Sequence, residues 1–141
     1  MTLYLDTSAL VKLYVTEEGR EAVIRAVEEA SRVATSTVAY AEARAALARR
    51  NREGAISNEE HRQIVSALDE GWESYDRLAV SNAVARRAGS IAERYALRGF
   101  DAIHLPSAVR LRQGFENLRF LAFDSQLVTA ARQMVPVYKE R

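Results

Sequence analysis

Short apolar runs alternate with longer amphipathic stretches along this chain. An apolar run of a few residues, bounded by polar or turn-forming residues, is typical of a buried strand. The runs predict five strands, at Thr2–Leu5, Arg32–Thr35, Leu78–Val80, Leu118–Phe123 and Val135–Tyr138. The run at Leu78–Val80 is the shortest of the five.

The amphipathic stretches between these runs have the periodicity of helices. Residues suited to capping mark several starts, and Ser57 with Glu60 forms the pattern of a capping box. The predicted helices cover Ala9–Tyr14, Glu17–Ser31, Ser36 or Thr37 to about Glu53, Ser57 to Trp72, Ser81 or Asn82 to Tyr95, Asp101 to about Gln113, and Ser125–Arg132.

Strands that alternate with helices pair in parallel through crossover connections. We therefore predict the α/β class, with a three-layer α/β/α sandwich around a central parallel sheet. The 141 residues suit one hydrophobic core, and no repeat or linker divides them. Residues 1–141 are accordingly expected to form a single domain.

The amino-acid composition excludes several kinds of site and function for this chain. The chain has no cysteine, which excludes disulfides and thiolate metal sites, and its two histidines are too few for a typical structural zinc site. The net charge of +1 provides no general basic field for nucleic acid. All of the 20 basic residues except Lys12 and Lys139 are Arg, a bias that suits phosphate contacts but is equally explained by genome composition. No apolar run approaches the ~18 residues of a membrane span, and the N-terminus resembles a strand rather than a signal peptide, so we expect a cytoplasmic protein.

Three acidic residues stand where a strand ends or a helix begins: Asp6, Asp101 and Asp124. Asp6 and Asp124 directly follow apolar runs, which places both at carboxyl ends of strands, the edge where open α/β sheets hold ligands. Asp101 stands at a predicted helix start. Each also has a simpler interpretation as a helix N-cap, worth ~1 kcal/mol, and capping is compatible with ligation.

Glu42 is the fourth acid of interest, because it lies inside an otherwise apolar helical stretch between Ala41 and Ala43. Small residues nearly all round predict a helix packed on several sides, where an unpaired carboxylate is costly. A salt bridge with Arg49 or a face open to water is the alternative. If the four acids converge, a cation must offset their repulsion. Oxygen-only ligands favour Mg²⁺ or Mn²⁺, and such an ion suits phosphodiester hydrolysis.

Three segments of the chain resemble PIN-domain proteins of the VapC toxin type. Residues 5–14 (LDTSALVKLY) are similar to the opening of that family, and residues 97–105 (LRGFDAIHL) to the segment around its third acid. Residues 120–124 (FLAFD), with Leu127 and the Ala130-Ala131 pair, are similar to the segment of the fourth acid. Glu42 falls where the family has its acidic helical residue, and the likeness extends from residue 2 to residue 137.

The resemblance implies a metal-dependent endoribonuclease that uses Mg²⁺ or Mn²⁺. It also implies the toxin of a type II toxin–antitoxin pair, a homodimer that acts on an RNA substrate and is inhibited by its cognate antitoxin protein. By the same resemblance Asp6 and Asp101 bind the metal, and Asp124 binds it directly or through water. Glu42 is a further ligand or orients the attacking water, and Ser8 holds Asp6 or a coordinated water.

Pro106 departs from the family pattern, which commonly has Ala after the His-Leu pair. A proline beyond the first turn clashes with the carbonyl four residues back and removes one helical hydrogen bond. We therefore predict a kink or a displaced helix start near residues 102–106.

Two other functions remain open. A haloacid-dehalogenase-like phosphatase also begins with a strand-end Asp, but it expects a second Asp two positions later, where Ser8 stands. A PIN-like binding domain with impaired catalysis is the other, and Pro106 is the feature in its favour. His104 is expected to be a packed, hydrogen-bonded core histidine rather than a base. Arginines either line a phosphate groove or form solvated helix faces; they are Arg44, Arg49, Arg50, Arg52, Arg86, Arg87, Arg94 and Arg98.

Overall fold

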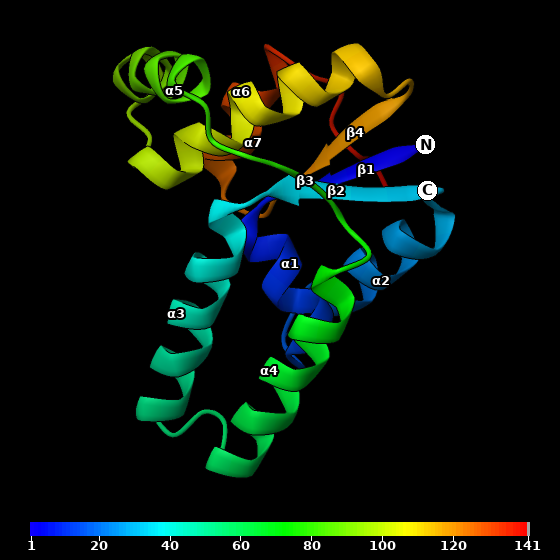
Figure 1. The fold of residues 1–141 in the computed structure, drawn as a ribbon, viewed down its shortest axis with the longest axis vertical. Helices are drawn as coiled ribbons and strands as arrows, with labels where there is room; N and C mark the ends of the chain where they lie inside the picture. Colours follow the sequence, from blue (N-terminus) through cyan, green and yellow to red (C-terminus); the bar gives the residue numbers. More distant parts are fainter. Residues whose placement is uncertain (141) are drawn as a thin grey trace.

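A parallel sheet with helices on both faces forms the centre of the computed structural model, which describes residues 1–140 (Figure 1). The strands are β1 (Thr2–Leu5), β2 (Arg32–Ser36), β3 (Asp76–Leu78) and β4 (Leu118–Leu121), in the order β3-β2-β1-β4. The helices are α1 (Thr7–Tyr14), α2 (Arg20–Glu29), α3 (Val38–Arg52), α4 (Asn58–Trp72), α5 (Asn82–Tyr95), α6 (Gly99–Gly114) and α7 (Ser125–Arg132). The predicted three-layer α/β/α sandwich is confirmed.

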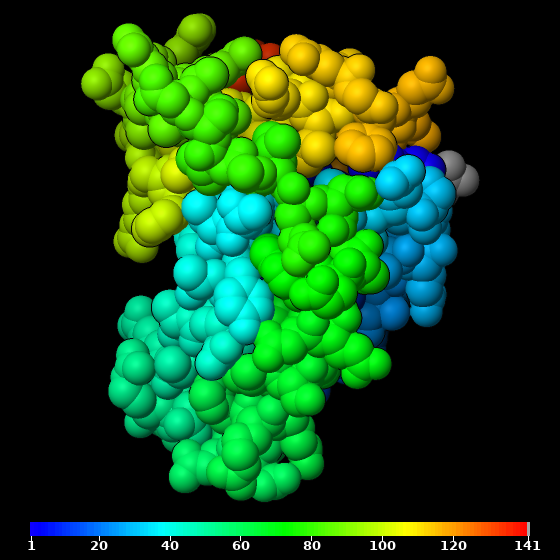
Figure 2. Space-filling model, in the orientation of Figure 1, coloured from blue at the N-terminus to red at the C-terminus, as the bar shows by residue number. Residues whose placement is uncertain are grey.

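Side chains of β1 alternate between two hydrophobic cores, because successive residues of a strand point to opposite faces of a sheet. Leu3 and Leu5 pack with α1, α2, α3 and α4 on one face, whereas Tyr4 packs with α5, α6 and α7 on the other. All three residues are fully buried. The helices α3 and α4 form a hairpin that projects from the sheet (Figures 1 and 2).

The third strand lies earlier than the apolar pattern predicted. It covers Asp76–Leu78 rather than Leu78–Val80, and it forms the edge of the sheet beside β2. Asp76 pairs with Ala34 in register, and its carboxylate accepts a hydrogen bond from Nε of Arg32 at 2.9 Å. An ion pair therefore takes the place of apolar contacts on this edge strand, which is why an apolar run did not mark it.

The predicted last strand is reduced to a single parallel bridge between Phe120 and Val137. Two backbone hydrogen bonds of 2.9 Å hold it, from the amide of Phe120 to Pro136 and from the amide of Tyr138 to Phe120. The segment thus lies against β4, as expected, without extending into a regular strand.

Helix ends follow local chemistry. The second helix begins at Arg20 rather than Glu17, because Gly19 precedes it with φ of 92°, a left-handed conformation that glycine adopts without strain. Ser57 and Glu60 form the predicted capping box at the start of α4. Within residues 1–140, no helix combines the length and apolar character needed to cross a membrane.

Candidate active site

Two of the four acids meet at the carboxyl edge of the sheet. Asp6 directly follows β1, and Asp124 lies just after β4, the parallel neighbour of β1. Leu5 and Leu121 are in register, and the amide of Asp6 donates to the carbonyl of Leu121 at 3.2 Å. The β1–β4 pairing therefore brings these two segments, more than a hundred residues apart in the chain, to one edge of the sheet.

Both aspartates also cap the helices that follow them, as predicted. A carboxylate oxygen of Asp6 accepts the amide of Ala9 at 2.9 Å, and one of Asp124 accepts the amide of Leu127 at 2.9 Å. Ser8 donates to both carboxylate oxygens of Asp6, at 2.8 and 2.9 Å. Asp6 is only 3% exposed, so its carboxyl is held rigidly inside the protein, whereas Asp124 is exposed.

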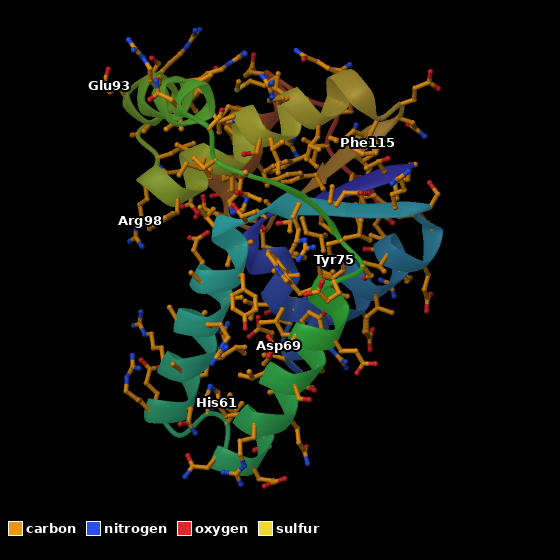
Figure 3. All side chains as sticks on the ribbon, viewed as in Figure 1. His61, Asp69, Tyr75, Glu93, Arg98 and Phe115 are labelled. Atoms are coloured by element: carbon orange, nitrogen blue, oxygen red, sulfur yellow. The ribbon has the colours of Figure 1, made fainter. Side chains whose placement is uncertain are left out.

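Asp101 is not the N-cap of its helix, and the prediction that α6 opens there is wrong. The helix begins at Gly99 with Arg98 as its N-cap residue, and the first helical hydrogen bond runs from the amide of Ala102 to the carbonyl of Arg98 at 2.9 Å. Asp101 is the third helical residue. Figure 3 places Arg98 at this N-terminal end of α6.

Pro106 lies in the interior of α6, which continues through it to Gly114. The prediction that the helix start is displaced to near residues 102–106 is wrong, because the helix begins earlier, at Gly99. Because proline has no amide hydrogen, the carbonyl of Ala102 lacks its helical partner. The neighbouring Ser107 hydroxyl donates to the carbonyl of Ile103 at 2.7 Å.

Electrostatic interactions connect all four acids. Burial raises the pKa of the Asp6 carboxyl above its ordinary value, and the charge of Asp101 raises it further, against the opposing effect of hydrogen bonds from Ala9 and Ser8. Burial also raises the pKa of Asp101, and the charges of Glu42 and Asp124 add to that effect. Nearby carboxylates therefore disfavour the ionisation of Asp6 and Asp101, which places the four acids in one negatively charged region.

The arrangement is not a closed coordination sphere. Within residues 1–140, no group of three or more Asp, Glu, His or Cys side chains is placed so that it could hold a metal ion. Coulomb interactions act over longer distances than metal–ligand bonds, so the acids share a region without forming a ligand set. Their chemistry nevertheless fits a hard dication, because all the donors are carboxylate oxygens and a cation would offset their mutual repulsion.

Glu42 makes its hydrogen bonds to residues that the sequence did not connect with it. Thr7 donates to its Oε1 at 2.5 Å, and Nε2 of His104 lies 3.3 Å from the same oxygen. The alternative ion pair with Arg49 is wrong, because Arg49 pairs with Glu53 at 2.9 Å. Glu42 is therefore a hydrogen-bonded, half-buried carboxylate at the start of the hairpin.

Histidine 104 is fully buried and hydrogen-bonded through both ring nitrogens, which confirms the expected core histidine. Its contact with Glu42 nevertheless connects it to the candidate site. Thr7 was not among the predicted site residues. A hydroxyl directly after Asp6, at a strand-to-helix junction, is the one sequence signal that marks it.

Two arginines of α3 are engaged in an ion pair or a hydrogen bond. Arg50 pairs with Glu17 at 3.0 Å, and Arg44 donates to the Tyr40 hydroxyl at 2.8 Å. His61 lies near the end of the hairpin remote from the sheet (Figure 3).

A family model described as PIN domain matches residues 3–133. Two known proteins of Mycobacterium tuberculosis, Ribonuclease VapC45 and Ribonuclease VapC49, are each 33% identical to this chain over 129 residues. The matched region is 92% of this chain and 88% of each relative. The chain therefore belongs to the PIN-domain family, as its sequence motifs predicted. Its relatives within that family are of the VapC type. The family match leaves the haloacid-dehalogenase-like alternative without support.

Solved structures agree with this fold. FitAcB from Neisseria gonorrhoeae superimposes with a TM-score of 0.70 at 17% identity, covering 97% of this chain and 96% of that chain. A toxin–antitoxin complex from Klebsiella pneumoniae gives a TM-score of 0.58 at 20% identity, covering 87% of both chains.

Proposed function

We propose that this chain is a metal-dependent endoribonuclease and the toxin of a toxin–antitoxin pair. The observation that carries the proposal is the position of Asp6 and Asp124 at the carboxyl edge of the sheet, in a PIN-domain chain 33% identical to proteins named ribonucleases. Hydrolysis of RNA phosphodiester bonds is the reaction that this set of residues suits best.

The cation proposed here is Mg²⁺ or Mn²⁺. Asp6, Asp101 and Asp124 would hold it, with Glu42 as a further ligand or as the group that orients the attacking water. When bound, such an ion polarises the scissile phosphate and lowers the pKa of a coordinated water. Ser8 keeps both oxygens of Asp6 in place.

The same carboxylates explain why a cation is needed. Two unit charges about 4 Å apart repel by about 4 kcal/mol at an effective dielectric of 20. Burial of Asp6 adds a desolvation cost to its charged form. A dication offsets both, so metal binding is expected to draw the four side chains closer than they lie in the metal-free protein.

The test is cleavage of labelled RNA in Mg²⁺ by wild type and by Asp6→Asn. Asparagine keeps the cap to Ala9 but removes the charge, and a loss of at least about 100-fold is expected, equal to about 2.7 kcal/mol of transition-state stabilisation. Glu28→Gln is the matched control, because Glu28 is exposed on α2 and outside the site. Equal cleavage by wild type and Asp6→Asn would refute the mechanism.

An antitoxin is the proposed protein partner, with an Arg that reaches the carboxylates. The negative charge of the site supports this proposal, and a neighbour in fold is a toxin–antitoxin complex. Co-expression with the adjacent gene tests it. Co-purification of its product, with loss of RNase activity in the complex, is the expected result, and an active, harmless chain without any partner would contradict it.

A homodimer is also proposed. An apolar groove between α5 and α6 is lined by small residues, including Ala85, Gly89 and Ala92, and Phe100 lies beside it with 55% of its surface exposed. Such a patch is more often an interface than a free surface. Light scattering on the purified chain would give the assembly directly.

A PIN-like domain with impaired catalysis is the second candidate. It is favoured by the absence, within residues 1–140, of a preformed group of three ligands, and by Pro106 inside the helix that carries Asp101. Calorimetric titration with Mn²⁺ separates the two. Binding that is lost in Asp6→Asn supports the ribonuclease, whereas no binding by wild type supports the impaired domain.

A further inference from the structure

A continuous series of hydrogen bonds joins the hydrophobic core to Glu42 through His104. The Tyr4 hydroxyl lies 2.8 Å from Nδ1 of His104, and Nε2 of the same ring lies 3.0 Å from Oγ1 of Thr7. Thr7 in turn donates to Oε1 of Glu42 at 2.5 Å. These four side chains come from β1, α1, α3 and α6, so the series links three helices to the central strand.

The chemistry of Glu42 fixes the direction of the hydrogen bonds at Thr7 and at Nε2 of His104. An ionised carboxylate only accepts, so the single hydroxyl hydrogen of Thr7 is committed to Glu42. Oγ1 of Thr7 and Oε1 of Glu42 are then both acceptors toward Nε2 of His104. That nitrogen must carry a hydrogen, because two acceptors surround it at 3.0 and 3.3 Å.

Tyr4 fixes the other side of the imidazole ring. Its ring stacks on Phe120 with centroids 5.4 Å apart and an interplanar angle of 9°, and it meets the His104 ring edge-on at 5.8 Å. A tyrosine hydroxyl keeps its hydrogen at neutral pH, so at 2.8 Å from Nδ1 of His104 it donates to that nitrogen. A neutral ring that accepts at Nδ1 carries its one hydrogen on Nε2.

The series also distinguishes the two oxygens of Glu42. Among residues 1–140, the side-chain hydrogen bonds of Glu42 all go to Oε1. The second oxygen, Oε2, is therefore the one left for a cation or a water molecule. Carboxylates that act at metal sites are commonly held in this way by partners on their other oxygen.

We propose that His104 is a positioning residue: with its hydrogen held on Nε2 by Tyr4, it acts with Thr7 to hold Oε1 of Glu42 and leaves Oε2 to the active site. The consequence for catalysis rests on the proposed ribonuclease function. The hydrogen-bond direction does not, so the two can be tested separately.

The first experiment leaves activity aside. Long-range ¹H–¹⁵N correlation of the metal-free protein, labelled with ¹⁵N-histidine, reports which ring nitrogen of His104 is protonated. His104→Gln identifies its signals, and His61 is the internal reference. The Nε2–H tautomer is expected in wild type. A ring protonated only on Nδ1 would overturn the proposal, whatever the protein does to RNA.

The second experiment compares matched variants at both positions. Gln places an amide nitrogen as many bonds from Cβ as Nε2 of histidine, whereas Asn places one where Nδ1 lies, so His104→Gln preserves the donor and His104→Asn does not. At the next link, Thr7→Ser keeps the hydroxyl and Thr7→Val removes it without changing the shape. Circular dichroism melts confirm that each variant folds before it is assayed.

Two readouts distinguish positioning from a merely structural role. His104→Asn and Thr7→Val are expected to lower kcat for RNA cleavage by about 10- to 100-fold, with little change in KM, whereas His104→Gln and Thr7→Ser keep most of it. Calorimetric Mn²⁺ affinity should fall in the same order. Equal kcat and Mn²⁺ affinity within each pair would overturn the proposal. Because the tautomer and Mn²⁺ measurements need no cleavage, they decide it even if wild type does not cut RNA.

Discussion

Replacing Asp6 by Asn is expected to stabilise the metal-free protein even though it removes the proposed activity. Asn caps a helix about as well as Asp, so the hydrogen bond from Ala9 is retained. The substitution removes a buried charge that is also repelled by Asp101. The repulsion between two charges about 4 Å apart, about 4 kcal/mol at a dielectric of 20, sets a ceiling, and partial protonation lowers the expected gain to about 1 to 2 kcal/mol.

The gain in stability of Asp6→Asn over wild type should increase as the pH rises. Because the folded-state pKa of Asp6 is raised, wild-type stability from this group is fully present below the unfolded pKa of about 4 and is lost as pH rises through the folded pKa. Asparagine does not titrate. The difference between the two proteins should therefore be small at pH 4 and open as the pH rises toward 7. Asp101, whose pKa is also raised, contributes the same trend to both.

Urea unfolding in the presence of a chelator is the assay, followed by the fluorescence of the single tryptophan, Trp72. Added Mn²⁺ should invert the order, since a ligand at 100 times its Kd stabilises wild type by about 2.7 kcal/mol. Glu28→Gln, the exposed control, should follow wild type within about 0.5 kcal/mol throughout. An Asp6→Asn protein that is less stable than wild type at pH 7 without metal would refute the reasoning, as would a difference that does not change with pH.

Three further predictions concern the scaffold. Gly71→Ala should destabilise the protein by about 1 to 3 kcal/mol, because an added Cβ would overlap the Tyr14 hydroxyl. Gly89→Ala should stabilise it by about 0.5 to 1 kcal/mol, because a Cβ added there meets no heavy atom within 4 Å. The urea midpoints of the two variants measure both effects. Ser57→Ala should cost about 1 kcal/mol by removing half of the capping box, again measured by urea unfolding, and no change would mean that water replaces the cap. Phe100→Glu should convert the proposed dimer to a monomer by light scattering, and a wild type that is monomeric would refute that assembly.

The sequence predicted best where one segment contained the whole signal. The run Thr2–Leu5 predicted β1 correctly, and Asp6 caps α1 as predicted, although the helix begins at Thr7 rather than Ala9. The alternation of strands and helices predicted the correct fold. The apolar pattern did not predict β3 correctly, because this edge strand is polar and is stabilised by an ion pair between Asp76 and Arg32. The start of α6 was also misplaced, because Asp101 was interpreted as the residue that opens the helix although the helix begins at Gly99.

The sequence could not predict which side chains of the candidate site form hydrogen bonds with one another. Thr7 and Glu42 are 35 residues apart, and Thr7 and His104 are 97 apart, so no local period relates them. The bonds arise only when α1, α3 and α6 converge at the end of β1. The sequence identified four candidate acids, but the rotamer of each, and which oxygen of Glu42 accepts hydrogen bonds, depends on tertiary packing.

Asp6 and Asp124 each cap the helix that follows them and also belong to the candidate site, which limits how this protein can lose function over evolutionary time. A lineage that escapes a harmful activity by mutation at these positions keeps a foldable chain only with residues that still accept an amide hydrogen, such as Asn, Ser or Thr. Inactive homologues should therefore carry polar residues at these two positions and apolar residues only rarely. An inactive copy of the protein would then still fold.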